Sequence, residues 1–133
     1  PTFGFIGQLW KFLQTDGGFI DNDAAMLIGE LNSNAKWDVW DRWWNHSDVV
    51  NELNELGIES FYHKFAGETQ GKETQPTLYF QRNLIRPYHI DYIFGAQKFA
   101  DKIIDFKIGE FDKWIGISDH MPVVCEIDYK LHS

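Results

Sequence analysis

Short apolar runs, each next to a polar cluster, constrain the fold of this chain more than any other feature. Residues 24–28 form an unbroken apolar run, which is typical of a strand covered on both faces. The polar segment that follows, residues 29–34, is predicted to be a loop. Residues 90–94 and 104–108 alternate between apolar and polar side chains, and residues 123–127 complete the set of long strands.

Helical patterns lie between these strands. Apolar side chains recur at three- and four-residue spacing over residues 3–15, which predicts an amphipathic helix. A second helix has its apolar face within residues 49–56, can be capped by Asn45 or Ser47, and stops at Gly57. Because strands and helices are interleaved without an internal repeat, the chain is predicted to be a single domain, 1–133, of α/β or α+β class.

Four shorter segments lack a long hydrophobic repeat and are predicted from composition and local spacing. Residues 59–62 favour a strand, and residues 77–80 favour another whose aromatic side chains belong to the core. Residues 66–75 are polar and contain glycine, so they are predicted to be an exposed loop. The tryptophans within residues 37–44 have helical spacing and are expected to pack under the sheet, the alternative being that they stack on a base or a lipid group.

Composition limits the functional classes. No run approaches the ~18 apolar residues of a membrane helix, so no membrane span is expected. The single cysteine, Cys125, rules out an internal disulfide framework and favours a reducing compartment, which predicts a cytoplasmic location and a buried strand thiol. The formal net charge of −8 argues against generalised polyanion binding. It leaves local binding open, because a divalent cation reverses the electrostatics of an acidic cleft.

Three polar clusters lie beside predicted strands, where a rigid sheet can hold catalytic groups. Carboxylates and imidazoles in such places can bind a divalent cation, orient water and stabilise the charge that develops on a phosphate. Taken singly, each cluster is more typical of ordinary capped or exposed groups. The clusters are Glu30 with Asn32, His89 with Asp91, and Ser118 with Asp119 and His120.

Taken together, the motifs GELNSN, HIDYIF and SDHMPVV resemble the C-terminal half of the endonuclease/exonuclease/phosphatase superfamily. That superfamily, which includes pancreatic-type DNases, carries Gly-Asp-Phe-Asn after a strand, then Ile-Asp-Tyr, then Ser-Asp-His before a final strand. The resemblance covers nearly the whole chain. It implies a two-sheet DNase-like α/β sandwich, of which this chain holds about one half.

The resemblance also implies a role for each matching residue. Asn32 would hold the scissile phosphate or the attacking water. Asp91 would orient His120 and raise its pKa, and His120 would stabilise charge on a phosphate oxygen. Glu30 stands where the family aligns or deprotonates the water. Asp119, with Glu30, would bind the metal, expected to be Mg²⁺ or Mn²⁺.

Two departures from the family pattern predict a weak or inactive enzyme. The extra methylene of Glu30 moves its carboxylate by roughly 1.5 Å, and a misplacement of about 1 Å can cost on the order of 100-fold in rate. The family's N-terminal half supplies a metal-binding Glu and a phosphate-contacting Asn, and no segment of this chain matches it. We therefore expect weak metal binding. Pro1 in place of Met suggests a processed or truncated product.

The predicted function is thus the C-terminal part of a metal-dependent phosphoester hydrolase, of nuclease or phosphodiesterase type. Its expected partners are a phosphoester substrate such as nucleic acid, and either the missing N-terminal half or a second copy in a dimer. The alternative is a catalytically incomplete binding or assembly module derived from that family. An unrelated α/β protein with chance motifs is a third interpretation. The stretch from Arg82 through Arg86 to His89 is interpreted either as anion-contacting or as ordinary surface charge.

Overall fold

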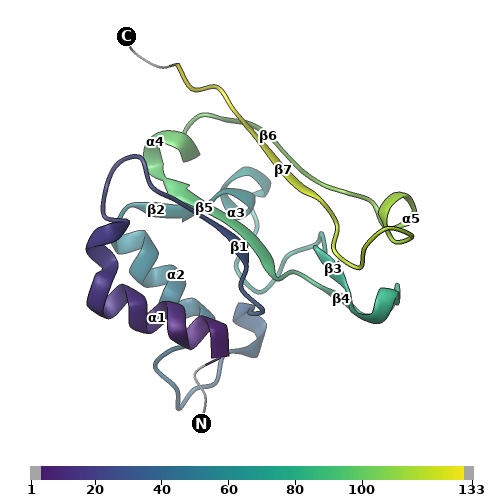
Figure 1. The fold of residues 1–133 in the computed structure, drawn as a ribbon, viewed down its shortest axis with the longest axis horizontal. Coiled ribbons are helices and arrows are strands. Elements are labelled where there is room, and N and C mark those ends of the chain that lie inside the picture. Colours follow the sequence, from purple (N-terminus) through teal and green to yellow (C-terminus); the bar gives the residue numbers. More distant parts are fainter. Residues whose placement is uncertain (1–3, 131–133) are drawn as a thin grey trace.

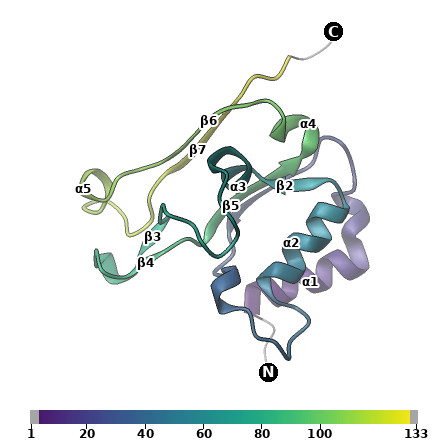
Figure 2. The ribbon, with the colours of Figure 1, turned by 180° about the vertical axis from the view of Figure 1, so that it is seen from behind.

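The computed structural model describes residues 4–130 as layers of strands and helices (Figures 1 and 2). Its main sheet has the order β1-β5-β2, with β1 at Met26–Glu30, β5 at Asp91–Ala96 and β2 at Ile58–Ser60. Both pairs are antiparallel. Ile28 lies opposite Ile93, and Glu30 lies opposite Asp91. This register fixes which side chains share a face of the sheet, because directly opposed residues point the same way.

One face of the main sheet is covered by two helices, α1 at Gly4–Asp16 and α2 at His46–Glu55 (Figure 1). The predicted helix over residues 3–15 is confirmed, although Phe3 itself lies outside the described residues. A 3-10 turn at Gly17–Phe19 follows α1. The core of this layer joins the apolar stripes of the helices to inward side chains of the strands, namely Ile6, Leu13, Val49, Leu53, Ile58, Tyr92 and Phe94.

The limits of α2 follow from its flanking residues. The backbone N–H of Asn45 donates to the Asp48 side chain at 2.8 Å, which satisfies a helix-terminal donor. The Asn45 side chain instead faces the preceding loop, where its oxygen accepts from the Val39 N–H at 2.8 Å. Gly57 adopts φ +76°, a left-handed conformation that ends helices. The prediction that Asn45 and Gly57 bound this helix is confirmed.

A second core lies on the opposite face of the main sheet. Helix α3 at Phe61–Ala66 and the antiparallel pair β6 (Ile103–Ile108) and β7 (Val123–Ile127) pack there. The short helix α4 at Gln97–Ala100 connects β5 to β6. The central buried side chains are Phe61, Tyr62, Ile93, Ala100 and Phe106. This arrangement of two facing sheets confirms the predicted α/β sandwich.

A small hairpin extends from the far end of the sheet, away from α1 and α2 (Figure 1). It consists of β3 at Leu78–Tyr79 and β4 at Pro87–Tyr88, joined through a 3-10 turn at Phe80–Arg82. Helix α5 at Phe111–Trp114 precedes the segment that returns to β7. That returning segment meets the hairpin through an isolated bridge between Leu78 and His120.

The prediction that the first strand is covered on both faces is wrong. Strand β1 is shifted to Met26–Glu30, and 41% of Met26 and 63% of Ile28 are exposed. The reason lies in the tertiary arrangement: β1 is an edge strand, and the second core covers the sheet beside it but not β1 itself. The prediction that Gly29 and Glu30 are loop residues is also wrong, since both pair with β5.

The tryptophan segment does not pack under the sheet, so that prediction is wrong as well. Residues 35–37 form a 3-10 turn, Ala35–Trp37, and no helix covers residues 38–44. Trp40 and Trp43 are 95% and 69% exposed. Only Trp44 reaches the first core. The spacing resembled a helix, but the Asn45 side chain holds this segment as a loop through its contacts with Val39 and Arg42.

Two further strand predictions are corrected in part. The segment predicted as strand 59–62 is strand only to Ser60, and α3 begins at Phe61. Phe80 is 45% exposed rather than a core residue, because the hairpin strand ends at Tyr79. Cys125 is half-buried on β7, and burial raises the pKa of its thiol. Among residues 4–130, the structure contains no helix long and apolar enough to cross a membrane.

Candidate active site

Glu30, Asp91 and His120 meet where β1 and β5 pair. Glu30 is the last residue of β1 and Asp91 the first of β5, and the register places them opposite each other. His120 arrives from the loop before β7, held by its bridge to Leu78. One potential ligand atom from each residue lies within 4.8 Å of the others. Residues separated by 90 positions in sequence therefore share one small site.

The His120 ring is directed at Asp91. Its Nδ1–H donates to Asp91 Oδ2 at 3.0 Å, which confirms the predicted contact. Its Nε2 lies 3.8 Å from Glu30 Oε1, too far for a hydrogen bond. The Asp91 side chain is 19% exposed and that of Glu30 is 44% exposed. The group borders a depression of about 240 Å³ that is otherwise lined by apolar side chains such as Ile28, Ile93 and Val123.

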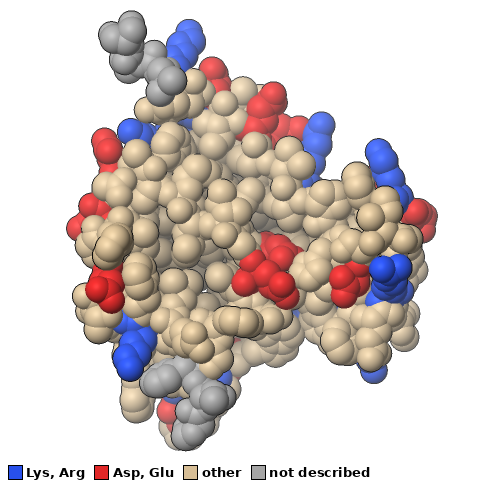
Figure 3. All heavy atoms as spheres, viewed as in Figure 1, with Lys and Arg blue, Asp and Glu red and all other residues tan. Residues whose placement is uncertain are grey.

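The surroundings of His120 favour its charged form. Partial burial alone would lower the pKa of the imidazole. The hydrogen bond and negative charge of Asp91, followed by the charges of Glu30 and Asp119, outweigh burial and raise the pKa of His120 above its usual 6.5. Acidic atoms gather near the centre of a largely uncharged face over β1 and β5 (Figure 3). The site therefore combines an imidazole whose charged form is favoured with acidic groups in a partly apolar setting.

Asn32 and Asp119, the other predicted site residues, lie beside this group rather than within it. Asp119 is half-buried, and its carbonyl oxygen accepts from the Tyr79 N–H at 2.9 Å. Asn32 is exposed in a left-handed conformation, φ +49°, two residues beyond Glu30. The structure thus places all five residues on adjoining segments, but only Glu30, Asp91 and His120 form the close group. The catalytic and metal-binding roles stay predictions.

The donor set suits a hard divalent cation in part. Carboxylate oxygens are the ligands that Mg²⁺ and Mn²⁺ prefer, and Mg²⁺ usually keeps several waters and substrate oxygens. Glu30 and Asp91 supply two carboxylates, with the Asp119 carboxylate near enough to influence His120. Because Asp91 already accepts a hydrogen bond from His120, Glu30 is the group most open to a metal.

The chain is similar in fold to NExo from Neisseria. The solved structures that match it include one of the 3'-5' exonuclease NExo from Neisseria meningitidis and one of the 3' phosphatase NExo from Neisseria bound to a product DNA hairpin. In each case the TM-score is 0.62 and the identity 20%, over 91% of this chain. The chain spans about half the length of those structures, 51%. The sequence matches no protein-family model and no curated protein.

An aromatic pocket of about 250 Å³ lies next to the candidate site. It is lined by Asn32, Trp37, Leu78, Phe80, Tyr88 and Ile90. Lys36 Nζ lies 4.6 Å from the centre of the Tyr88 ring, within cation–π range, so a positive charge stands beside the pocket. The pocket adjoins the close group, because Ile90 precedes Asp91 and Leu78 bridges His120. Such a pocket can hold the sugar or base next to a bound phosphate.

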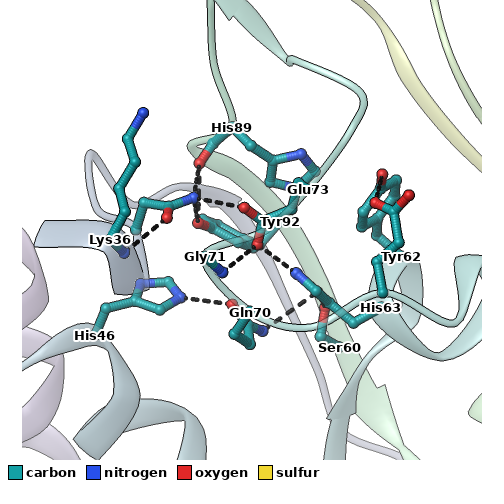
Figure 4. Close-up of polar contacts among 12 residues, drawn as sticks. Lys36, His46, Ser60, Tyr62, His63, Gln70, Gly71, Glu73, His89 and Tyr92 are labelled. Atoms are coloured by element: carbon teal, nitrogen blue, oxygen red, sulfur yellow. Dashed lines mark hydrogen bonds and ion pairs between the residues drawn. The ribbon is translucent and has the colours of Figure 1, made fainter. Parts of the chain in front are cut away.

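The loop over residues 66–75 is not simply exposed, which corrects the sequence prediction. Glu73 turns inward, and only 3% of its side chain is exposed. Its carboxylate accepts from His63 Nε2 at 2.6 Å, from Asn34 Nδ2 at 3.0 Å and from the Gly71 N–H at 2.9 Å (Figure 4). Gln70 Oε1 accepts from His46 Nε2 at 2.9 Å. A polar segment of this kind gives no pattern that distinguishes a buried carboxylate from a solvated one.

Asn34 links this buried network to the segment just before β5. It is 2% exposed, and its Nδ2 also donates to the His89 carbonyl oxygen at 2.9 Å. The Tyr92 hydroxyl donates to the Ser33 carbonyl oxygen at 2.7 Å. These bonds tie the loop that carries Asn32 to the segment that carries Asp91. Sequence reasoning singled out Asn32 but missed Asn34, which follows it in the same motif.

Burial keeps two histidines of this region neutral. It lowers the pKa of His46, a shift that the hydrogen bond to Gln70 only partly opposes, and it lowers the pKa of His89 in the same way. His89 Nδ1 lies 2.8 Å from the Gln75 carbonyl oxygen, whereas its buried Nε2 has no hydrogen-bond partner among the described residues. His89 is therefore a structural group and not an exposed anion contact.

Arg82 and Arg86 remain exposed on the hairpin. Arg86 Nη1 donates to Gln81 Oε1 at 3.1 Å, and its guanidinium lies 5.7 Å from the centre of the Phe80 ring. Arg82 Nη1 lies 3.5 Å from the Gly116 carbonyl oxygen. Both interpretations given to this stretch, anion contact and ordinary surface charge, stay open for the arginines.

Proposed function

We propose that this chain is the C-terminal part of a metal-dependent phosphoester hydrolase of the endonuclease/exonuclease/phosphatase superfamily. The observation that carries the proposal is the Asp91–His120 hydrogen bond of 3.0 Å beside Glu30, at the edge of a sandwich shared with a DNA exonuclease and phosphatase. The three motifs of the sequence resemblance meet at this edge. Fold likeness alone does not fix an activity, so the proposal rests on these residues.

In the proposed reaction, water attacks phosphorus and gives a proton to Glu30, and the bond from phosphorus to the leaving oxygen breaks, with the leaving oxygen taking up a proton from solvent. His120, charged below its raised pKa, donates from Nε2 to a phosphate oxygen and stabilises the added negative charge. Asp91 accepts from Nδ1 and fixes the ring orientation. Glu30 orients the water, and Asn32 holds the phosphate. A bound Mg²⁺ or Mn²⁺, held by Glu30 with Asp119, would neutralise phosphate charge.

Nucleic acid is the proposed substrate class, in a nuclease or phosphodiesterase reaction. Two features support it: the aromatic pocket next to the close group, and the nucleic-acid activities named for the two solved structures. The net charge of −8 favours a single-stranded end or a terminal phosphate over a long duplex. Cytoplasmic location and a single domain over residues 1–133 stay predictions from the sequence.

The test measures phosphate or nucleotide release from a 3'-phosphorylated and an unmodified single-stranded oligonucleotide, with Mg²⁺ and with Mn²⁺. We expect His120→Ala and Asp91→Asn each to remove any activity of the parent chain. Asp23→Asn is the matched control, since that side chain is 89% exposed and forms an ion pair with Lys98 at 3.7 Å. Activity that survives His120→Ala would show that a contaminant or another site is responsible.

Glu30 offers a gain-of-function test of the same site. Glu30→Asp restores the family's residue and shortens the side chain by one carbon–carbon bond, roughly 1.5 Å. We expect tighter Mg²⁺ binding and a rate on the order of 10- to 100-fold higher, because positioning errors of that size have such effects. Glu30→Gln is the paired control and should do neither. An equal rate for Glu30→Asp and the parent would contradict the assigned role.

A second candidate function is a binding module that needs another polypeptide. Met26 and Ile28 share the sheet face of Ile93, which is buried in the second core, yet 41% of Met26 and 63% of Ile28 are exposed. An apolar core that is exposed to solvent at the edge strand β1 favours association. We propose that either a complementary half or a second copy covers it. Catalytic inactivity of Glu30→Asp, together with stable association through this face, would favour this function over hydrolysis.

A further inference from the structure

Thr77 lies where three chain segments of the candidate site meet. It is 0% exposed. Its N–H donates to the Tyr88 carbonyl oxygen at 2.9 Å, and its carbonyl oxygen accepts from the Met121 N–H at 2.7 Å. Tyr88 lies three residues before Asp91 in the chain, and Met121 directly follows His120. The backbone of Thr77 is thus hydrogen-bonded to both segments that carry the Asp91–His120 pair.

The Thr77 side chain makes a second connection to the Asp91 segment. Its Oγ1 accepts from the Ile90 N–H at 3.0 Å and from the Asp91 N–H at 3.1 Å. These amides lie between the end of β4 at Tyr88 and the start of β5 at Asp91, where the chain passes from the hairpin into the main sheet. A side-chain acceptor is needed there, because buried N–H groups without partners are costly.

We propose that Thr77 is a positioning residue for the Asp91–His120 pair. Its hydroxyl fixes the backbone at Asp91, and its carbonyl fixes the backbone beside His120, so that carboxylate and imidazole are held at 3.0 Å. Its effect on turnover rests on the proposed hydrolase function. The effect on the geometry of the pair does not. Thr77 never touches the substrate in this scheme and acts only through the two residues it holds.

Three substitutions of Thr77 separate the effect of its hydroxyl acceptor from the effect of its shape. Thr77→Val keeps the shape and removes the acceptor that the Ile90 and Asp91 N–H groups share, whereas Thr77→Ser keeps the acceptor and removes a methyl group. Thr77→Cys differs from Thr77→Ser in one atom and carries a poor acceptor. Thr69→Val is the matched control, because Thr69 is exposed on the 66–75 loop.

The primary measurement is the ring ¹⁵N shifts of His120 at alkaline pH, where the imidazole is neutral. In the parent and in Thr77→Ser, we expect the tautomer with the proton on Nδ1, facing Asp91. In Thr77→Val, or in Thr77→Cys if Val prevents folding, we expect the averaged shifts of a ring without a fixed partner. Thr69→Val should match the parent.

Turnover gives an independent readout. If the parent chain hydrolyses phosphoesters, Thr77→Val should lower kcat on the order of 10- to 100-fold with little change in KM, and Thr77→Ser should restore most of kcat. Unchanged His120 shifts in folded Thr77→Val and Thr77→Cys would overturn the inference, as would an equal loss in Thr77→Ser. If the parent chain and Glu30→Asp both lack turnover while the parent shows the expected shifts, the proposed function alone is contradicted.

Discussion

Glu73 should contribute a large, pH-dependent share of the stability of this chain. Burial alone would raise the pKa of its carboxyl, but hydrogen bonds from His63, Asn34 and the Gly71 N–H lower it from 4.5 to about 2. A shift of that size corresponds to about 3 kcal/mol of folding free energy at neutral pH. Because the folded pKa lies below the unfolded one, this stability is present above pH 4.5 and is lost as the pH falls towards 2.

The perturbation is Glu73→Gln, which preserves shape but removes the charge and one acceptor oxygen. The new amide group would face the His63 ring, the Asn34 amide or the Gly71 N–H, all of which donate to the carboxylate. We expect the variant to be about 2–3 kcal/mol less stable at neutral pH, in line with the loss of buried charge-assisted bonds. The difference should shrink below pH 4.5, as acid protonates Glu73 in the unfolded parent chain.

The assay is urea unfolding followed by tryptophan fluorescence, which the six tryptophans make sensitive. Parent and variant are compared at about pH 7, 5 and 3.5. Burial lowers the pKa of His46 and of His89, so stability also falls below pH 6.5 as unfolded histidines take up protons. The charge of Glu73 raises the pKa of both histidines, so the variant loses more of this stability in acid than the parent does, which opposes the shrinking of the difference.

The control is Glu55→Gln, an exposed carboxylate at the end of α2. Its substitution should change the unfolding free energy by less than about 0.5 kcal/mol at every pH. A Glu73→Gln variant as stable as Glu55→Gln at neutral pH would refute the reasoning. So would a large difference that stays constant down to about pH 3.5, because it would reflect packing and not the charge.

Three further outcomes are expected. NMR titration should place the pKa of His120 above 6.5, and Asp91→Asn should lower it; a parent pKa at or below 6.5 would contradict the Asp91–His120 contact. The stability that this contact contributes is full below the unfolded pKa of His120 and is lost as the pH rises through the folded pKa. Sedimentation should show that the parent chain self-associates or aggregates and that Ile28→Ser reduces this association. A monodisperse parent monomer would argue against association through the exposed apolar face of β1. Gly95→Ala should destabilise the fold by about 1–3 kcal/mol in denaturant unfolding, because an added Cβ would overlap the Phe61 ring, and an unchanged midpoint would show that the ring can move.

Sequence by itself determined the local elements and the identity of the close group. Apolar spacing predicted α1 and α2, and Asn45 and Gly57 marked the limits of α2. The resemblance of the three motifs to the superfamily predicted the α/β sandwich and the pairing of Asp91 with His120. These features are readable because helix periodicity, caps and short motifs are local properties of the chain.

Only the tertiary structure decided what is buried. A run of apolar residues does not show whether another element packs against it. Ile28 was therefore predicted to be a buried strand residue, whereas the structure shows it exposed. A polar loop cannot show that Glu73 turns inward, because its donors Asn34 and His63 come from other segments. Thr77 likewise gains its role only when residues 88–91 and 121 fold against it. Burial and hydrogen bonding depend on contacts between distant segments, and a linear pattern does not contain them.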